Sequence, residues 1–145
     1  MRKSQSQSGN KMFIINCKNY EEIVGEKIIK IAKTAEKLSK KYNIPIAIAP
    51  PHHLIPLITK FKITVLAQHL DDKKIGSTTG FMIPEIVKKS KIHGSLINHS
   101  EHRISEKEIK SLVKRLQKLR LKTVLCVKNV NEVKKYAKLN PTFIA

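Results

Sequence analysis

Short polar runs follow several apolar runs of strand length in this sequence, and they contain residue types that can do carbonyl chemistry. They are Asn16-Cys17-Lys18, Gln68-His69, Asn98-His99 and Lys128-Asn129. If the apolar runs are parallel strands, these polar residues meet at one edge of the sheet, where α/β proteins bind ligands. There Lys18 would supply a fixed positive charge, the Asn amides would orient a ligand, and His99 would donate a hydrogen bond to a developing oxyanion. The pattern predicts a site for a small anionic substrate that carries a carbonyl group.

Each of these residues also has an ordinary structural interpretation. Asn16 and Asn98 stand at strand ends, where Asn side chains commonly bond the loop backbone, and His99 alone fits a hydrogen-bonded structural histidine. His99 and His102 have an H-x-x-H spacing, but the sequence has no third ligand nearby and no H-E-x-x-H motif, so we predict no metal site. The sequence also lacks G-x-G-x-x-G and Walker A motifs, which argues against dinucleotide and ATP binding.

Apolar runs and helical periodicities alternate along the chain. Strands are predicted at 12–17, 46–49, 64–67, 95–97, 123–127 and 142–145, and helices at 21–42, 51–61, 84–90 and 130–139. A further helix starts after Ser105, because Ser105 and Glu108 have capping-box spacing and apolar residues from Ile109 to Leu119 repeat on one helical face. Alternating helices and wholly apolar strands predict a parallel sheet that is buried on both faces.

This alternation fits two architectures, an open doubly wound sheet or part of a (β/α)₈ barrel. The length of 145 residues favours the open sheet, since a complete barrel needs about 250 residues. The sixth predicted strand, at the last residues, favours a barrel fragment, because a complete domain rarely stops within a strand. Periodicity alone does not separate the two. In either case the polar stretch 71–80 is a loop, and His52-His53 is expected to decorate another loop after two prolines.

The chain carries 29 Lys and Arg against 11 Asp and Glu, a net charge of +18. Only four of these cations are arginines, the residue whose planar guanidinium forms paired hydrogen bonds with guanine and with phosphate. The aromatic residues also lack the regular spacing with which single-strand binders stack bases. We therefore expect weak, salt-sensitive adhesion to polyanions and no specific nucleic-acid partner. No apolar run approaches 18 residues, and residues 1–12 lack the apolar stretch of a secretory signal. These features predict a soluble, cytoplasmic chain with no membrane partner.

The first residues differ in composition from the remainder. Residues 1–11 are expected to be a disordered tail or a misassigned start, since Met12 opens the first apolar run and would be a natural initiator. Residues 12–145 then form a single domain. Cys17 and Cys126 both lie inside apolar runs and share no C-x-x-C motif, so we expect two buried, reduced thiols and neither a disulfide nor a metal pair.

Four motifs in this chain resemble those of triose-phosphate isomerases, in particular the short archaeal form. They are Asn16 to Tyr20 (family N-x-K-x-Y), Ala67 to Asp71 followed by Gly76 to Gly80 (A-Q-H-x-D, then G-S-H-T-G), Asn98 to Arg103 (N-H-S-E-x-R) and Asn140 to Ala145 (the run into the sixth strand). The motifs keep the family's order and spacing from about residue 12 to the last residue. The N-H-S-E-x-R block is specific and the others are moderately so.

The resemblance implies an incomplete (β/α)₈ TIM barrel with about five βα units and the start of a sixth strand. It also implies the family's reaction, which interconverts dihydroxyacetone phosphate and glyceraldehyde 3-phosphate through an enediolate, in glycolysis and gluconeogenesis and without a cofactor. In this family a neutral histidine polarises the carbonyl group. That residue would be His99, with Lys18 and the supporting acid Glu101 beside it, while Asn16, Cys17 and Lys18 would bind the substrate.

The chain departs from the family pattern in ways that affect activity and assembly. Pro51 replaces a usual Gln, and Thr78 replaces the His of the loop that reaches into a partner subunit in the family's dimers and tetramers. The family's catalytic Glu and its later phosphate loops would lie beyond Ala145. We therefore expect a fragment that is inactive alone and that works as a homo-oligomer or with a complementing C-terminal half. The alternative is a non-catalytic α/β domain that binds a small anionic ligand.

Overall fold

The computed structural model describes residues 11–145. The predicted tail, residues 1–11, lies outside the described residues except for Lys11, which is exposed. Among the helices of residues 11–145, none has the length and hydropathy of a membrane span.

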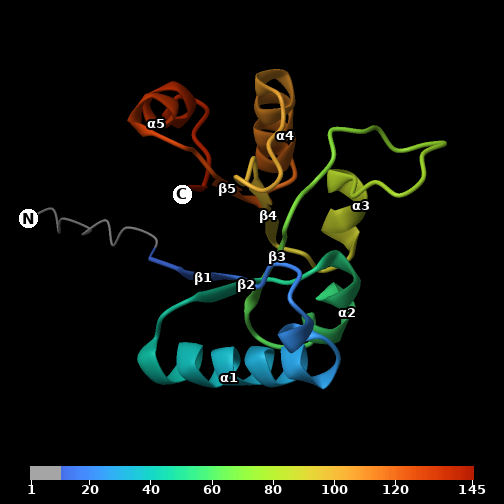
Figure 1. Cartoon of the computed structure of the whole chain (residues 1–145), viewed down its shortest axis with the longest axis vertical. Coiled ribbons are helices and arrows are strands. Elements are labelled where there is room, and N and C mark those ends of the chain that lie inside the picture. Colours follow the sequence, from blue (N-terminus) through green and yellow to red (C-terminus); the bar gives the residue numbers. More distant parts are fainter. Residues whose placement is uncertain (1–10) are drawn as a thin grey trace, which may run out of the picture.

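Strands and helices alternate along the described chain, as the sequence predicts (Figure 1). The strands are β1 (Phe13–Asn16), β2 (Ile46–Ala49), β3 (Thr64–Ala67), β4 (Gly94–Ile97), β5 (Lys122–Leu125) and β6 (Phe143–Ile144). The α-helices are α1 (Glu26–Tyr42), α2 (Ile55–Ile58), α3 (Pro84–Lys89), α4 (Glu106–Lys118) and α5 (Val130–Ala137). The short 3₁₀ helices η1 (Glu21–Ile23) and η2 (His52–Leu54) precede α1 and α2.

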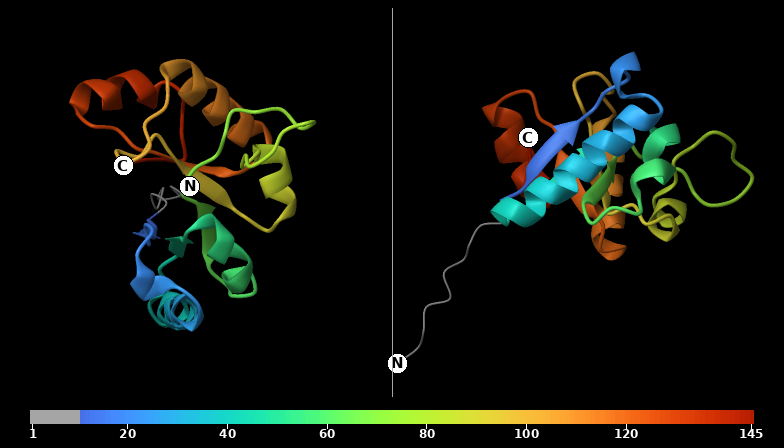
Figure 2. Two further views of the ribbon diagram at one scale, coloured as in Figure 1. Left: turned by 45° about the vertical axis from the view of Figure 1, so that its right-hand side comes forward. Right: turned by 90° about the horizontal axis from the view of Figure 1, so that it is seen from below.

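All six strands form one parallel sheet in the sequential order β1-β2-β3-β4-β5-β6. A doubly wound sheet reverses its strand order at a switch point, whereas a βα barrel adds each strand next to the previous one. The sequential order therefore confirms the prediction of an incomplete barrel and excludes the open doubly wound sheet. Figure 2 shows the helices arranged around the outside of the curled sheet.

The alternation of side chains across each strand divides the core into two layers. The residues Ala47, Ala49, Leu66, Leu96 and Val124 form the inner cluster, against which Met12, Ile14 and Phe143 pack. The outer cluster is larger, because the neighbouring positions of the same strands, such as Ile48 and Leu125, pack against the helices. All four residues of β2 are buried, which explains why its sequence is apolar throughout and does not alternate.

A glycine fixes the spacing between two neighbouring strands. Gly94 pairs with Lys122 across β4 and β5, and a Cβ atom added to Gly94 would overlap with the backbone oxygen of Lys122. Only a residue without a side chain fits at this contact. The glycine thus allows β4 and β5 to approach closely at the end of the sheet opposite the polar strand ends.

The predicted elements are confirmed; α3 and α5 end one or two residues earlier than predicted, and two other helices are much shorter than their sequence patterns indicate. The 21–42 segment divides into η1 and α1, because Gly25 adopts a φ of +64° between them. The 51–61 segment contains only η2 and the four-residue α2. The capping box is present as predicted, since the Ser105 side chain accepts the Glu108 backbone N–H and the Glu108 carboxylate accepts the Ser105 N–H.

Candidate active site

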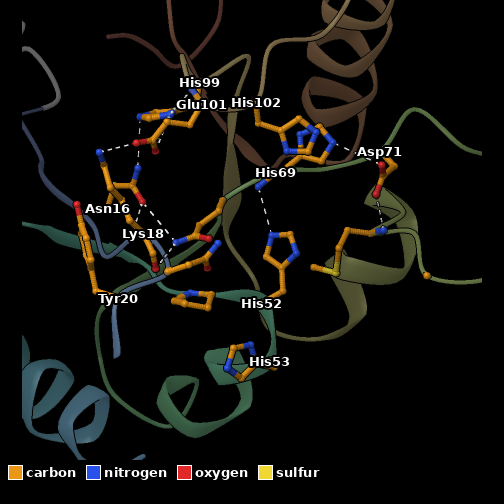
Figure 3. A pocket seen from close by; sticks show the side chains of 15 residues that line it. Asn16, Lys18, Tyr20, His52, His53, His69, Asp71, His99, Glu101 and His102 are labelled. Atoms are coloured by element: carbon orange, nitrogen blue, oxygen red, sulfur yellow. Dashed lines mark hydrogen bonds and ion pairs between the residues drawn. The ribbon is translucent and has the colours of Figure 1, made fainter. Parts of the chain in front are cut away.

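A cavity of about 670 Å³ lies at the carboxyl ends of the first four strands. The residues around it come from the loops after β1, β2, β3 and β4, and they are Asn16, Lys18, Asn19, Tyr20, Pro51, His52, His53, Gln68, His69, Asp71, Gly80, Met82, His99, Glu101 and His102. Figure 3 shows two groups of side chains, with Asn16, Lys18, His99 and Glu101 on one side and His52, His69, Asp71 and His102 on the other. Five of the chain's six histidines thus surround one cavity.

The chain turns sharply where β1 ends, and this turn presents Lys18 to the cavity. Lys18 has a φ of +52°, in the left-handed region that residues with a side chain rarely adopt. Its backbone N–H donates to the Asn16 side-chain oxygen at 3.0 Å, an Asx-type bond that stabilises the turn. The same Asn16 side chain points its nitrogen towards His99, so one residue both shapes the turn and faces the cavity.

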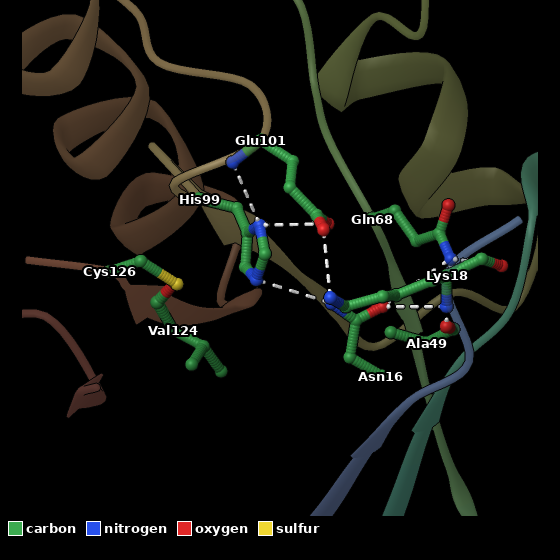
Figure 4. A network of polar contacts seen from close by, with 8 residues as sticks. All are labelled: Asn16, Lys18, Ala49, Gln68, His99, Glu101, Val124 and Cys126. Atoms are coloured by element: carbon green, nitrogen blue, oxygen red, sulfur yellow. Dashed lines mark hydrogen bonds and ion pairs between the residues drawn. The ribbon is translucent and has the colours of Figure 1, made fainter.

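Gln68, at the end of β3, braces this turn from the neighbouring strands. Its side-chain nitrogen donates to the backbone oxygens of Lys18 at 3.1 Å and of Ala49 at 3.2 Å, and it lies 3.4 Å from the Asn16 side-chain oxygen. These contacts join the carboxyl ends of β1, β2 and β3 through one amide group (Figure 4). The left-handed conformation of Lys18 is therefore held by the side chains on both sides of it.

Lys18 and Glu101 form an ion pair across the cavity. The Lys18 ammonium donates to the Glu101 carboxylate at 2.7 Å, although the two residues are 83 positions apart in sequence. This hydrogen bond raises the pKa of Lys18 and lowers the pKa of Glu101. Both side chains are solvent-accessible, at 38% and 58% exposed. The ammonium has three donors, so two remain for an anionic ligand.

Contacts at both ring nitrogens of His99 fix the orientation of the ring. The Glu101 backbone N–H donates to His99 Nδ1 at 3.2 Å, and the Glu101 carboxylate lies 3.5 Å from the same nitrogen. On the cavity side, Nε2 lies 3.4 Å from the Asn16 side-chain nitrogen, which donates to Nε2 only in the tautomer that has no proton there. In the other tautomer, with the proton on Nε2, both N–H groups can donate to one oxygen atom placed between them. In that tautomer His99 and Asn16 form a donor pair that suits a carbonyl or enolate oxygen.

Asn98 positions His99 from beneath the loop. It has a φ of +60°, and only 3% of its surface is exposed. Its side chain donates to the Cys126 backbone oxygen at 3.1 Å and accepts the Ile104 N–H at 3.1 Å. These bonds link the end of β4 to the end of β5 and close the loop that carries His99 and Glu101. Asn98 therefore has a structural role here, as one of its two interpretations predicted.

The second group in the cavity is a cluster of histidines with one carboxylate. The rings of His69 and His102 stack with their centroids 3.8 Å apart, and His69 Nε2 lies 3.4 Å from the Asp71 carboxylate. His52 Nε2 accepts the backbone N–H of His69 at 3.3 Å. Burial lowers the pKa of His52 and of His69, and each is lowered further by a neighbouring histidine. Both shifts favour the neutral form of the His52 and His69 rings.

The structure brings together most, but not all, of the predicted site residues. Asn16, Lys18, His99 and Glu101 meet at one side of the cavity. The side chain of Cys17 packs in the outer core cluster and does not line the cavity. Burial raises the pKa of its thiol, which keeps Cys17 protonated.

Two residues predicted at the mouth of the sheet, Lys128 and Asn129, lie outside the cavity lining. The Asn129 side chain accepts the Glu132 N–H at 2.9 Å and caps α5, and the Lys128 ammonium lies 3.9 Å from the Glu132 carboxylate. Both side chains therefore interact with the first turn of α5. The sequence contains the signal for this, since Asn129 and Glu132 have the spacing of a helix cap.

Sequence reasoning missed His52, which was expected to decorate a loop. His52 lies in the 3₁₀ helix η2, lines the cavity and bonds the backbone of His69. No local signal marks this role, because the contact joins two different strand–helix connections. Within residues 11–145, the structure contains no group of three or more His, Cys, Asp or Glu side chains arranged to hold a metal ion.

The sequence also matches a model of a known protein family along almost the whole described chain. Residues 11–143 match the family described as triosephosphate isomerase. The chain belongs to the triosephosphate isomerase family. The resemblance inferred from the four ordered motifs is thereby confirmed, and the residues around the cavity lie within the matched segment.

Triosephosphate isomerases of archaea are similar to this chain over most of its length. The protein from Cenarchaeum symbiosum is 46% identical over 134 residues, which are 92% of this chain and 60% of that protein. The protein from Methanocaldococcus jannaschii is 38% identical over 135 residues, or 92% of this chain and 62% of that protein. The chain thus spans about 60% of the length of the curated relatives it matches.

A solved structure supports the barrel architecture. The crystal structure of triosephosphate isomerase from Bartonella henselae superposes with a TM-score of 0.67, covering 89% of this chain and 55% of that one. The two sequences are 20% identical in this comparison, so the likeness concerns the fold. Within this family, the chain forms an incomplete α/β barrel.

Proposed function

We propose that residues 12–145 carry the carbonyl-polarising half of a triosephosphate isomerase site. The reaction is the interconversion of dihydroxyacetone phosphate and glyceraldehyde 3-phosphate through an enediolate, without a cofactor. The observation that carries the proposal is the convergence of Asn16, Lys18, His99 and Glu101 on one side of the cavity. Membership of the family supports the choice of reaction.

His99 is the electrophile in this proposal. Its Nε2–H donates to the substrate carbonyl oxygen, and the donor bond strengthens as negative charge develops on that oxygen. The reaction uses the tautomer with the proton on Nε2, in which the Glu101 backbone N–H donates to Nδ1 at 3.2 Å and orients the ring. Asn16 adds a second donor to the same oxygen, because its side-chain nitrogen faces His99 Nε2.

Lys18 supplies the positive charge that attracts the anionic substrate. In the described state its ammonium is paired with Glu101 and keeps two free donors, so substrate can bind without breaking the pair. Glu101 acts as the supporting acid that holds the ammonium over the cavity. Substrate binding by Cys17 stays a prediction. The Cys17 side chain packs in the outer core cluster and does not line the cavity.

We propose that residues other than these 145 supply the proton-abstracting base and the phosphate-binding loops. A general base is worth about 10²–10⁴-fold in rate. We therefore expect the 145-residue polypeptide alone to have no useful isomerase activity. In this proposal the chain is cytoplasmic and works either as a homo-oligomer or together with a complementing C-terminal half. The projecting loop around Gly76, with Ile75 61% exposed and Phe81 44% exposed, offers apolar surface for such a contact.

A chimera tests the proposal. Residues 12–145 are joined to the part of the Cenarchaeum symbiosum protein that follows its 134 matched residues, and isomerase activity is measured for the chimera and for the 145-residue chain. We expect activity in the chimera and none above background in the chain. A folded chimera without activity would contradict the proposal and favour a non-catalytic domain that binds a small anion. Robust activity of the 145-residue chain would contradict the predicted need for the missing base.

A further inference from the structure

Helix α1 carries a row of lysines along the face that points away from the core. They are Lys27, Lys30, Lys33, Lys37, Lys40 and Lys41, and all six are exposed. At about 100° per residue the six occupy a sector about 140° wide. The centre of this sector lies about 180° from the buried residues Ile28, Ala32 and Ala35. We call these six residues the α1 lysine row.

The charge of the α1 lysine row is not neutralised within the protein. In the part of the chain that the structure describes, none of the six ammonium groups lies within ion-pair distance of a carboxylate. The acidic residues of α1 are Glu26, in its first turn, and Glu36, which accepts the Lys62 backbone N–H. By contrast, Lys110 of α4 and Lys135 of α5 both pair with Glu106.

Within residues 11–145, no other helix or strand lies over the outward side of α1, which carries the lysines. Figure 1 shows α1 at the lower edge of the molecule, and the view from below in Figure 2 shows it lying across the near face. It is also the longest helix of the described chain, with 17 residues. A long, straight partner could therefore reach all six lysines at once.

We propose that the α1 lysine row binds the phosphate backbone of duplex nucleic acid without sequence preference. From Lys27 to Lys41 the helix rises about 21 Å at 1.5 Å per residue. A duplex carries one phosphate charge about every 1.7 Å of its axis with both strands counted, so a length of about 21 Å carries about twelve, and about half of these face one side. The number of lysines in the row matches the number of phosphates on the facing side. The inference does not rest on the proposed isomerase activity.

The residue types of the row explain why the backbone is the ligand and the bases are not. Lysine is a compact point charge that suits phosphate, whereas base reading depends on the planar fork of arginine, and α1 contains no arginine. A membrane surface is a poorer partner, because an interfacial helix must insert its apolar face. In α1 that face is already buried against the sheet through Ile28, Ala32 and Ala35.

The test measures binding of the full 145-residue chain to fluorescent 24-base-pair duplexes by anisotropy. Two unrelated sequences, each as DNA and as RNA, are titrated between about 50 and 300 mM NaCl. We expect dissociation constants of about 10⁻⁴–10⁻⁶ M near physiological salt, with similar values for all duplexes. If all six lysines contact phosphates of B-form DNA, log K falls with log salt with a slope of about −5.

Two triple variants with the same change in charge separate the row from net charge. The first variant carries Lys30→Gln, Lys33→Gln and Lys37→Gln. It should reduce the magnitude of the slope of log K against log salt by about 2.7, at about 0.9 for each lost contact. The control variant carries Lys74→Gln, Lys89→Gln and Lys118→Gln, at exposed lysines in the loop before α3, in α3 and in α4. It should reduce the magnitude of the slope by less than about 1. Gln has nearly the helix propensity of Lys, so α1 should persist, as circular dichroism would verify.

A measurement on the unaltered chain accompanies the variants. Acetylation of lysines by acetic anhydride, read by mass spectrometry, should slow at the α1 lysine row when duplex is present and stay unchanged at Lys74, Lys89 and Lys118. Equal loss of binding in the two triple variants would overturn the proposal. So would absence of binding at 50 mM NaCl, a tenfold preference for one sequence, or tighter binding to vesicles with 30% phosphatidylserine than to the duplexes.

Discussion

Replacing Arg115 should loosen the wall of the candidate site, because this side chain ties together three segments. Arg115 of α4 donates to both carboxylate oxygens of Glu85 in α3, at 3.1 and 2.6 Å. It also donates to the Asp72 carboxylate at 2.6 Å and to the Lys73 backbone oxygen at 2.8 Å. Asp72 follows Asp71 at the base of the projecting loop, where Asp71 accepts the Met82 N–H at 2.7 Å.

The expected cost follows from the burial of these groups. The side chains of Arg115, Asp72 and Glu85 are 20%, 22% and 34% exposed, so the network is neither buried nor fully hydrated. Breaking a buried pair costs about 3–5 kcal/mol, and a surface pair contributes about 0–1 kcal/mol. We expect Arg115→Met to cost about 2 kcal/mol of unfolding free energy. For a chain of this size that lowers Tm by about 4–8 °C.

Urea denaturation at pH 7 measures the effect, and Lys135→Met is the matched control. The Lys135–Glu106 pair is 49% and 40% exposed, so its loss should leave the urea midpoint unchanged within error. The hydrogen bond from Arg115 lowers the pKa of Glu85, so the stability it provides is present above the ordinary Glu pKa and is lost as pH falls. The difference between Arg115→Met and the unaltered chain should therefore shrink from pH 6 to pH 3. Equal midpoints for both variants at pH 7 would refute the reasoning.

Three further predictions concern the fold around the site. Burial lowers the pKa of His52 and of His69, so the stability that depends on their neutral forms is fully present above the ordinary His pKa and is lost as pH falls below it. The urea midpoint should therefore drop between pH 7.5 and pH 5.5, and this drop should be smaller in His52→Gln. Gly94→Ala should cost about 3 kcal/mol, because the new methyl group meets the Lys122 backbone oxygen, and a variant with an unchanged Tm would disprove that contact. Ser105→Ala should cost about 1 kcal/mol and expose the first-turn amides of α4 to hydrogen exchange, whereas unchanged exchange rates would show that the cap is dispensable.

Local patterns predicted the elements well, because each strand is a short apolar run and each long helix has a clear apolar face. The residues 46–49 and 64–67 were predicted as strands with the bounds that the structure has. The same patterns left open whether the sheet was a doubly wound sheet or a barrel segment, since strand order is set by packing between distant elements. The break at Gly25 was also missed, because the apolar periodicity of 21–42 runs across it.

The candidate site was predictable where it depends on position along a strand. Asn16 ends β1, and Lys18 and His99 each come two residues after the end of a strand; parallel strands bring such residues to one edge. The brace formed by Gln68 and the contact between His52 and His69 were not predicted, since they depend on the curl of the sheet and on loop geometry. Proximity of this kind has no signal in composition or spacing.

The central claim is that His99 polarises the substrate carbonyl. The most direct test is whether replacing His99 in the chimera changes kcat or KM. kcat and KM are measured for the chimera, for His99→Gln and for His93→Gln. His93 lies before β4, at the opposite end of that strand, and bonds the Val65 N–H. We predict that His99→Gln lowers kcat by about 10²–10³-fold with little change in KM, and that His93→Gln leaves kcat unchanged. An unchanged kcat in His99→Gln, or an effect confined to KM, would contradict the account.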